Sequence, residues 1–419
     1  MLKNKNILVA VTGSIAIYKS CELIRLFAKA GANIRVVMTE SAKKFIAPLT
    51  FEVLSGAKVL DESTENWASD YNHIAIGKWA DLFVIAPATA NTINKLSNGI
   101  ADNMLTQIAL AYPRMKIIAP AANTNMIENP LTQASLKMLK LCNYEIISPV
   151  SKELACKDIG NGAMADVQDI FDASVRELLK DDFWSNRKIV ITAGGTIEKI
   201  DDARCITNFS SGKMGVALAS ALYCKGADVC LIKTASVKEK VCSQIHTIEV
   251  QNAKEMYEFT MDSLRVAQKG VLTKSTLMDS SNTQLIQKKP FFFSVAAVSD
   301  YTPAFAQSGK IKKEDIGENW DLKLKKNIDI LASVPKENLF AIGFKAEMDK
   351  TTGKQNAKNM LETKKLDAVC LNFITAQNNF GSNENEIELI FGDSSKQLAK
   401  NTKQNIAFEI LESLKARFE

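Results

Sequence analysis

A turn near the N-terminus has the residue types that bind a phosphate group. Gly13 and Ser14 follow an apolar run at residues 7–11, and the amphipathic pattern after them predicts a helix that stops at Gly31. Backbone N–H groups at such a helix N-terminus can bind an anion. The dinucleotide fingerprint GxGxxG is absent, because only one glycine is present, so a mononucleotide such as FMN fits better than NAD. The alternative is that Gly13 only makes the turn.

A histidine stands close to a run of small and amide-bearing residues. His73 precedes an apolar segment that predicts a strand, and this segment leads into Pro87, Thr89 and Asn91. A flat ring and its ribityl phosphate could pack closely against such a run. A lone histidine is more often structural than catalytic, so it is these surroundings that favour a role for His73 in chemistry.

A glycine- and serine-rich loop marks a second candidate phosphate-binding site in the C-terminal half. The sequence NFSSGKMG contains a Gly-Lys pair, but Met214 stands where a P-loop needs a Ser or Thr to bind magnesium. Thr207 stands where the same motif needs a glycine. We therefore interpret the loop as a phosphate cradle of another type, placed at the N-terminus of a predicted helix.

Strands and helices in alternation must position these residues. Residues 7–38 form a predicted βαβ unit. The same alternation of strands and helices recurs up to residue 126 and again from residue 188. Parallel strands of this kind deliver functional side chains at their carboxyl edge. The charged stretch at residues 178–187 separates the two halves. We predict an α/β fold with two domains, one over residues 1–180 with a parallel sheet covered by helices and a Rossmann-like α/β domain over residues 187–419.

Composition excludes several classes of protein. With 419 residues, 46% hydrophobic and 24% charged, the chain is too apolar for intrinsic disorder and too long for one small module. A net charge of +5 is much smaller than the excess of positive charge that is typical of nucleic-acid-binding proteins. The eight cysteines include no CxxC pair, and only two histidines are present, so the usual zinc spacings have no ligand set. We expect a cytoplasmic protein without a membrane or nucleic-acid partner.

The N-terminal half resembles a known family. The segments TGSIAIYKS, YNHIAIGKW, APATANTINKLSNGIADN and PAANTNM match, in order, the flavin-containing cysteine decarboxylases, a flavodoxin-like group. The resemblance covers residues 5–175. It implies that His73 and Asn123 are catalytic, and that Cys156, in a mobile flap with Gly160 and Gly162, donates a proton. It also implies FMN as the cofactor, and the contacts predicted for it are Gly13, Ser14, Thr39, Ser41, Pro87, Thr89 and Asn91.

The residue chemistry agrees with this resemblance. Loss of CO2 from a cysteinyl carboxylate needs an electron sink, and FMN supplies one by oxidising the thiol side. The Asn123 amide can hold the carboxylate without an opposing charge. Three residues depart from the family pattern, with Ala122 in place of Met, Ile127 in place of Trp and Ala163 in place of Arg. These positions contribute to substrate binding and to the geometry of the flap, so both could differ from the family.

The C-terminal half resembles the phosphopantothenate-cysteine ligases over residues 187–414. The resemblance lies in NFSSGKMG, AAVSDY, KIKK, NIDIL, GFKAE and FGSNENEI. It implies that CTP activates a carboxylate as an acyl-cytidylate, that Asn208 and Lys310 act on this intermediate, and that Asp300 lies at the nucleotide and Mg2+ site. The other nucleotide contacts that it implies are Ser294, Val295, Ala296, Ile328, Asp329, Ile330, Leu331, Phe344, Lys358 and Lys364, with Lys310 and Asp300 beside them.

Together the halves resemble the bifunctional coenzyme A biosynthesis proteins. This resemblance implies ligation of 4'-phosphopantothenate with L-cysteine, followed by decarboxylation to 4'-phosphopantetheine. It also implies a homo-oligomer in which decarboxylase domains form trimers, ligase domains pair and the whole closes into a dodecamer. Lys345 stands where the family has Ala and adds a cation beside the nucleotide pocket. The resemblance therefore does not decide whether CTP or ATP is the preferred nucleotide. Two alternatives are a flavin-binding regulatory or interaction protein and a peptidyl-cysteine decarboxylase.

Overall fold

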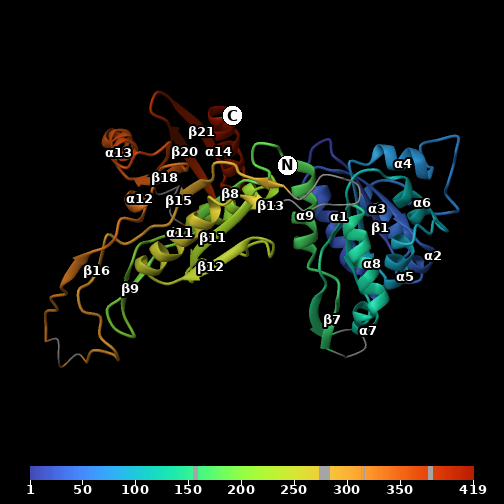
Figure 1. Cartoon of the computed structure of the whole chain (residues 1–419), viewed down its shortest axis with the longest axis horizontal. Helices are drawn as coiled ribbons and strands as arrows, with labels where there is room; N and C mark the ends of the chain where they lie inside the picture. Colours follow the sequence, from blue (N-terminus) through green and yellow to red (C-terminus); the bar gives the residue numbers. More distant parts are fainter. Residues whose placement is uncertain (154–158, 273–283, 313, 315–316, 376–380) are drawn as a thin grey trace. The chain divides into compact units, whose positions relative to one another are not determined.

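The computed structural model describes residues 1–153, 159–272, 284–312, 314, 317–375 and 381–419 (Figure 1). The described residues divide into two compact units. Unit 1 comprises Met1–Leu179, and unit 2 comprises Lys180–Leu272 with Leu285–Glu419. Within the part of the chain that is described, every helix is too short or too polar to cross a bilayer.

Unit 1 is built on a five-stranded parallel sheet with the order β2-β1-β3-β4-β5. This order, 2-1-3-4-5, is that of the flavodoxin-like fold, so the fold predicted for the N-terminal half is confirmed. The strand order reverses between β1 and β3, where ligands bind in such sheets. The strands are β1 (Asn6–Val11), β2 (Asn33–Met38), β3 (Leu82–Ala88), β4 (Lys116–Pro120) and β5 (Tyr144–Ile146).

Helices cover both faces of this sheet. On one face α1, α3 and α9 pack together, and α4, α5, α6 and α8 contact one another on the other. The central strands are almost wholly apolar and buried, as a sheet covered on both faces requires. The bounds are η1 (Ile15–Ile17), α1 (Tyr18–Lys29), α2 (Glu40–Lys43), α3 (Pro48–Ser55), α4 (His73–Trp79), α5 (Ala90–Ser97), α6 (Met104–Ala111), α7 (Thr124–Glu128), α8 (Pro130–Leu141) and α9 (Val167–Leu179), with an antiparallel pair β6 (Val150–Glu153) and β7 (Ile159–Ala163).

Amide and hydroxyl side chains fix where the helices at the carboxyl edge of the sheet begin. Thr89 caps α5, Asn103 caps α6 and Asn123 caps α7, each by accepting a hydrogen bond from a backbone N–H of the first turn. Such caps satisfy donors that a helix N-terminus leaves open. The residues that follow each strand are thereby held in a defined conformation.

A buried lysine at the start of β4 gives the first testable prediction. The Lys116 ammonium lies over the rings of Tyr144, at 4.8 Å from the centroid, and of Tyr112, at 5.6 Å. Burial lowers the pKa of Lys116 from 10.5 to about 8. The unfolded chain therefore binds more protons between about pH 8 and 10.5, and the stability of wild type rises with pH across this window.

We expect Lys116→Met to raise the free energy of unfolding at pH 7 by about 2 kcal/mol, because the charged form is the one that burial penalises. The gain over wild type should shrink as the pH rises towards 10. Urea unfolding of both proteins at pH 7 and pH 10 measures this difference. A gain that is equal at both pH values would contradict the assignment.

Unit 2 is built on an eight-stranded sheet with the order β12-β11-β8-β15-β18-β19-β20-β21. Its first six strands are parallel and, counted within the unit, run 3-2-1-4-5-6, which is the Rossmann order and confirms the predicted fold. The last two strands are antiparallel. The strands are β8 (Lys188–Ala193), β11 (Asp228–Thr234), β12 (His246–Val250), β15 (Phe291–Ser294), β18 (Phe340–Glu347), β19 (Ala368–Phe373), β20 (Glu384–Ile390) and β21 (Ser395–Thr402).

The remaining elements of unit 2 are its helices and three small antiparallel pairs. In Figure 1 the strands β9 and β16, which contact each other, lie in an arm that extends away from the large sheet of this unit. The helices are α10 (Lys213–Cys224), α11 (Ala253–Ala267), α12 (Ile330–Ser333), α13 (Lys350–Thr363) and α14 (Lys403–Phe418). The pairs are β9 (Ile197–Lys199) with β10 (Cys205–Thr207), β13 (Val271–Leu272) with β14 (Leu285–Ile286), and β16 (Tyr301–Pro303) with β17 (Leu324–Lys326).

Candidate active sites

A cavity of about 670 Å³ opens at the carboxyl edge of the first sheet. Its walls come from the turns after β1, β2, β3 and β4, at the point where the strand order reverses. A cavity of this size is typical for a cofactor. Six of the predicted FMN contacts line it, namely Gly13, Ser14, Thr39, Ser41, Thr89 and Asn91.

Two observations show that these residues fit a flavin phosphate. A Cβ added at Gly13 would lie 2.6 Å from the Cβ of Ser41, so only glycine lets the two turns approach this closely. The Thr39 hydroxyl is buried and has no hydrogen-bond partner among the described residues. Buried polar atoms rarely stay unpaired in a working protein, so this hydroxyl suits a ligand oxygen.

The Gly13 contact yields a second prediction. Gly13→Ala should weaken FMN binding at least about 10-fold, because the added methyl group must displace the Ser41 turn. Gly77→Ala is the matched control, since a Cβ there would meet nothing within 4 Å. Flavin fluorescence titration of the two apoproteins measures the affinities. Equal affinity for FMN in Gly13→Ala and in the control would show that this turn does not contact the flavin.

Pro87 is the one predicted flavin contact that does not line this cavity. Its carbonyl oxygen accepts a hydrogen bond of 2.8 Å from the hydroxyl of Thr12, and Thr12 does line the cavity. The wall also holds Lys95, Asp102 and Asn103, which belong to the polar run after β3 that was expected to pack against a flavin ring, and Glu62, which sequence reasoning did not single out. Lys95 and Asp102 form an ion pair of 2.5 Å, and this hydrogen bond lowers the pKa of Asp102.

His73 is the first residue of α4, after the N-cap Asn72. Its Nδ1 atom lies 2.8 Å from Oε1 of Glu65, and Trp67 contacts the ring edge-on at a centroid distance of 5.3 Å. His73 is not part of the lining of the cavity in its own chain.

Asn123 follows β4. Its two chain neighbours, Ala122 and Thr124, contact glycines of the flap strand β7. Its Oδ1 atom accepts a hydrogen bond of 2.9 Å from the backbone N–H of Asn125, and its neighbour Ala122 lines the cavity. A Cβ at Gly160 would collide with the side chain of Thr124, and one at Gly162 with the carbonyl of Ala122. The flap strand β7 therefore packs directly on the Asn123 turn. Cys156 lies outside the described residues.

A second cavity, of about 220 Å³, opens at the carboxyl edge of the second sheet, beside the ends of β15, β18 and β19. The glycine- and serine-rich loop before α10 forms one wall, and Gly212, with a φ of 71°, is the N-cap of that helix. Three predicted nucleotide contacts, Val295, Ala296 and Phe344, line the cavity, as does Lys345. Polar and cationic members that sequence reasoning did not assign to the nucleotide site are Lys213, Asn372, Asn385 and Lys403.

Two lysines of this wall begin helices and bind the same turn. The Lys213 ammonium donates to the carbonyl of Gly381 at 2.9 Å, and the Lys403 ammonium donates to that of Ser382 at 2.5 Å. Burial lowers the pKa of Lys403, and the charge of Lys213 adds to the effect. Cations are disfavoured at helix N-termini, so both would gain from an anion in the cavity. The wall is chemically suited to a phosphate chain.

The other residues predicted for the nucleotide site lie outside the lining of this cavity. Asp300 is tied to the turn before α12, because its carbonyl accepts a 2.8 Å hydrogen bond from the N–H of Asn327. Lys364 pairs with Asp329 at 2.7 Å; despite partial burial, this hydrogen bond holds the pKa of Asp329 below its usual range. Outside the lining are Ser294, Asp300, Lys310, Ile328, Asp329, Ile330, Leu331, Lys358 and Lys364.

Ile330 and Leu331 are core residues, only 3% and 5% exposed, so a nucleotide could reach little more than their backbone. Asn208 lies on the loop before α10, and its side-chain N–H donates to the carbonyl of Val298 at 3.1 Å. A Cβ at Gly195 would lie 2.5 Å from the carbonyl oxygen of Asn208. The loop with Asn208 thus packs closely on the turn after β8.

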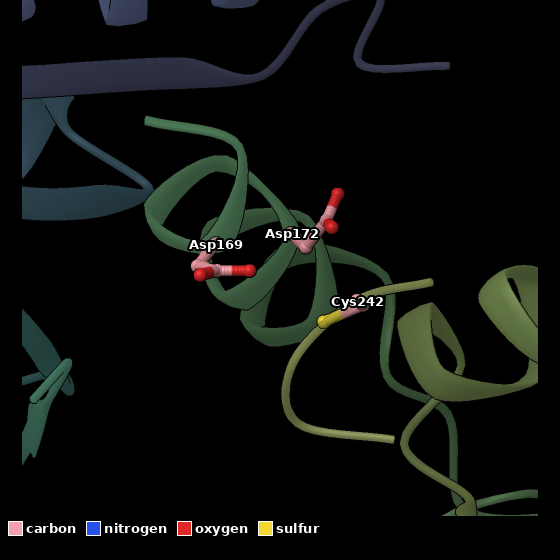
Figure 2. A group of neighbouring side chains, drawn as sticks. All are labelled: Asp169, Asp172 and Cys242. Atoms are coloured by element: carbon pink, nitrogen blue, oxygen red, sulfur yellow. The ribbon is translucent and has the colours of Figure 1, made fainter. Parts of the chain in front are cut away.

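Figure 2 draws three side chains that carry metal-ligating groups, Asp169, Asp172 and Cys242. Asp169 and Asp172 lie one turn apart on α9 of unit 1, whereas Cys242 belongs to unit 2. Because the group is not part of either unit alone, we assign no metal site to it.

Comparison with known proteins assigns both units of the chain to a family. The Flavoprotein family model matches residues 1–179, and that of the DNA/pantothenate metabolism flavoprotein C-terminal domain matches residues 184–275 and 265–417. The Coenzyme A biosynthesis bifunctional protein CoaBC of Vibrio vulnificus (strain CMCP6) is 35% identical over 418 residues, which cover 99% of this chain and 98% of the relative. The chain belongs to the CoaBC family.

Two further CoaBC proteins show the same relation. That of Bacillus subtilis (strain 168) is 36% identical over 423 residues, covering 99% of this chain and 98% of its own. That of Escherichia coli (strain K12) is 33% identical over 424 residues, covering 100% and 98%. Membership of the CoaBC family confirms the resemblance drawn from the sequence motifs, and it makes the chain a bifunctional enzyme of coenzyme A biosynthesis.

Proposed function

We propose that the chain joins 4'-phosphopantothenate to L-cysteine in unit 2 and decarboxylates the product in unit 1, giving 4'-phosphopantetheine. The observation that carries this proposal is the pair of cavities, each at the carboxyl edge of its own sheet. One is lined by six predicted flavin contacts and the other by a glycine- and serine-rich loop with three lysines, Lys213, Lys345 and Lys403. A flavin-dependent reaction and a phosphate-transfer reaction each have a separate site.

The ligation begins with activation of an unreactive carboxylate. The carboxylate of 4'-phosphopantothenate attacks the α-phosphate of CTP, so a P–O bond forms, pyrophosphate leaves, and an acyl-cytidylate results. The cysteine amine then attacks the acyl carbon and CMP leaves. Charge concentrates on the phosphates, and the lysines around the cavity with Mg2+ at Asp300 would offset it. Asn208 and Lys310 hold the intermediate for the second step.

The decarboxylation uses residues of unit 1 around the first cavity. The turns with Gly13 and Ser14 would hold FMN, which would take two electrons from the thiol side so that CO2 can leave and would return them to give the product thiol. Asn123 holds that carboxylate through its amide. The imidazole of His73 exchanges a proton with the substrate, and Cys156 returns one.

We further propose that the enzyme works as a homo-oligomer in the cytoplasm. His73 lies outside the lining of the flavin cavity of its own chain, so a neighbouring copy is needed to bring the two together. Trimers of the decarboxylase domain, pairs of the ligase domain and a dodecamer of the whole are the assembly that the family resemblance implies. The mass of the purified protein in solution tests this proposal.

An absorption spectrum and a pyrophosphate assay of the purified protein test the function. We expect a yellow protein that releases pyrophosphate with 4'-phosphopantothenate, cysteine and CTP, and less with ATP. A yellow protein that releases no pyrophosphate with either nucleotide would favour a flavin-binding regulatory protein. CO2 release from a peptide with a C-terminal cysteine, without release from 4'-phosphopantothenoyl-cysteine, would favour a peptidyl-cysteine decarboxylase.

A further inference from the structure

A carboxylate lies against the ring of the proposed catalytic histidine. Oε1 of Glu65 is 2.8 Å from Nδ1 of His73, and the two side chains are only 25% and 23% exposed. A carboxylate accepts hydrogen bonds and donates none, so the proton of this contact belongs to Nδ1. Neither the family resemblance stated above nor the motifs in the sequence assign a role to Glu65.

The chain between the two residues is folded so that they meet. The backbone N–H of Asn66 donates to the carbonyl of Tyr71 at 2.8 Å, which closes a short loop. The Asn66 side chain accepts the N–H of Ala68 at 2.8 Å, and the Asn72 side chain caps α4 by accepting the N–H of Ala75 at 2.8 Å. Glu65 precedes this closed loop and His73 follows it. The contact therefore follows from the backbone of the loop.

The same loop fixes the plane of the ring. Trp67 lies edge-on to the imidazole, with an interplanar angle of 88°. Within the described part of the chain, no hydrogen bond reaches Nε2 of His73. One nitrogen is thus taken by a carboxylate and the other is available to a ligand.

We propose that Glu65 is a positioning residue for the decarboxylation, which accepts the Nδ1–H of His73 and so keeps the neutral ring in the tautomer whose Nε2 is an open acceptor. The proposal rests on the function proposed above, in which His73 exchanges a proton with the substrate. A carboxylate that orients an imidazole in this way fixes which nitrogen can act as base. Glu65 touches no substrate and acts only through His73.

Loss of the carboxylate should lower kcat for decarboxylation and leave KM unchanged. Partners that orient a histidine are typically worth about 10- to 100-fold. In Glu65→Leu the ring can take either tautomer, so Nε2 carries the proton in part of the molecules. In Glu65→Gln an amide oxygen can still accept the Nδ1–H, and we expect partial rescue, with a loss of about 3- to 10-fold by the same reasoning.

The tautomer can be read directly, because the chain has only two histidines. Magic-angle-spinning NMR of the 15N-histidine-labelled holoenzyme resolves protonated and unprotonated ring nitrogens, and His73→Asn assigns the two rings. Asp70→Asn is the matched control, since Asp70 is an exposed acid of the same loop without a hydrogen-bond or ion-pair partner among the described residues. Pyrophosphate release by unit 2 and the flavin content report on folding.

Wild type and Asp70→Asn should show His73 protonated at Nδ1 only, and Glu65→Leu should show both tautomers with kcat reduced about 10- to 100-fold. The proposal is overturned if Glu65→Leu keeps the wild-type tautomer or the wild-type kcat. If Glu65→Leu does not fold, the kcat of Glu65→Gln decides, because a loss of about 3- to 10-fold supports the proposal and a wild-type kcat overturns it. A wild-type enzyme without CO2 release would refute the proposed function, whereas the NMR spectrum would still report on the contact.

Discussion

Replacing His73 with asparagine is expected to lower CO2 release from 4'-phosphopantothenoyl-cysteine by at least about 100-fold, which is the usual contribution of a general acid or base. Pyrophosphate release should remain at the wild-type rate, because His73 belongs to unit 1 and the nucleotide cavity belongs to unit 2. Asparagine is close to histidine in size and polarity, so the loop closed by Asn66 and Tyr71 should survive. Both rates are measured on the same preparation, with a coupled pyrophosphate assay and trapping of CO2.

The control for this variant is His246→Asn. His246 is exposed on β12 of unit 2, so it lies in the other unit from the flavin cavity. The control should keep both activities. If His73→Asn reduces both activities to the same extent, the two cavities do not work as separate sites. If it reduces neither, His73 has no part in the chemistry.

The second large effect is expected from Asn208→Asp, in the other half of the chain. The Asn208 amide donates to the carbonyl of Val298, and an aspartate in its place cannot donate and brings a negative charge. The charge would face both this carbonyl and the phosphates of the substrates. We expect ligation to fall at least about 100-fold, as for other groups that stabilise charge in a transition state.

Supplied with ready-made 4'-phosphopantothenoyl-cysteine, Asn208→Asp should still release CO2 at the wild-type rate. Asn359→Asp is the matched control, because Asn359 is exposed on α13 and is not part of the cavity wall. Ligation that survives in Asn208→Asp would remove this residue from the site. Loss of both activities in this variant would point to misfolding, which the flavin spectrum and the control distinguish from a local effect.

Much of both sites could be predicted from the sequence because strands with polar, small-residue ends are locally encoded. Gly13, Thr39 and Thr89 each follow an apolar run, and parallel strands bring their carboxyl ends to one edge. The parallel direction of the central strands follows from the same alternation of strands and helices, whereas the strand order, which differs between the two sheets, does not. The glycine- and serine-rich loop before α10 was also visible, since a helix pattern follows it directly.

The remainder depends on contacts that no local pattern encodes. Lys403 reaches the nucleotide cavity only because the antiparallel strands β20 and β21 return the chain to the sheet edge. The contact of Glu65 with His73 depends on a closed loop that has no regular secondary structure. Gly160 and Gly162 suggested a flexible lid, but their described role is close packing against Thr124 and Ala122. Such steric needs become visible only when both partners are in place.

The fate of the carboxyl carbon of cysteine tests the central claim, that two chemically separate sites in one chain act in sequence. The purified protein is supplied with 4'-phosphopantothenate, CTP, Mg2+ and cysteine labelled with 14C at its carboxyl carbon. The account predicts that the label leaves as CO2, with one CO2 for each pyrophosphate at completion, and that omission of 4'-phosphopantothenate or of CTP stops both. Labelled CO2 formed without 4'-phosphopantothenate, or pyrophosphate formed with all of the label kept in the product, would contradict it.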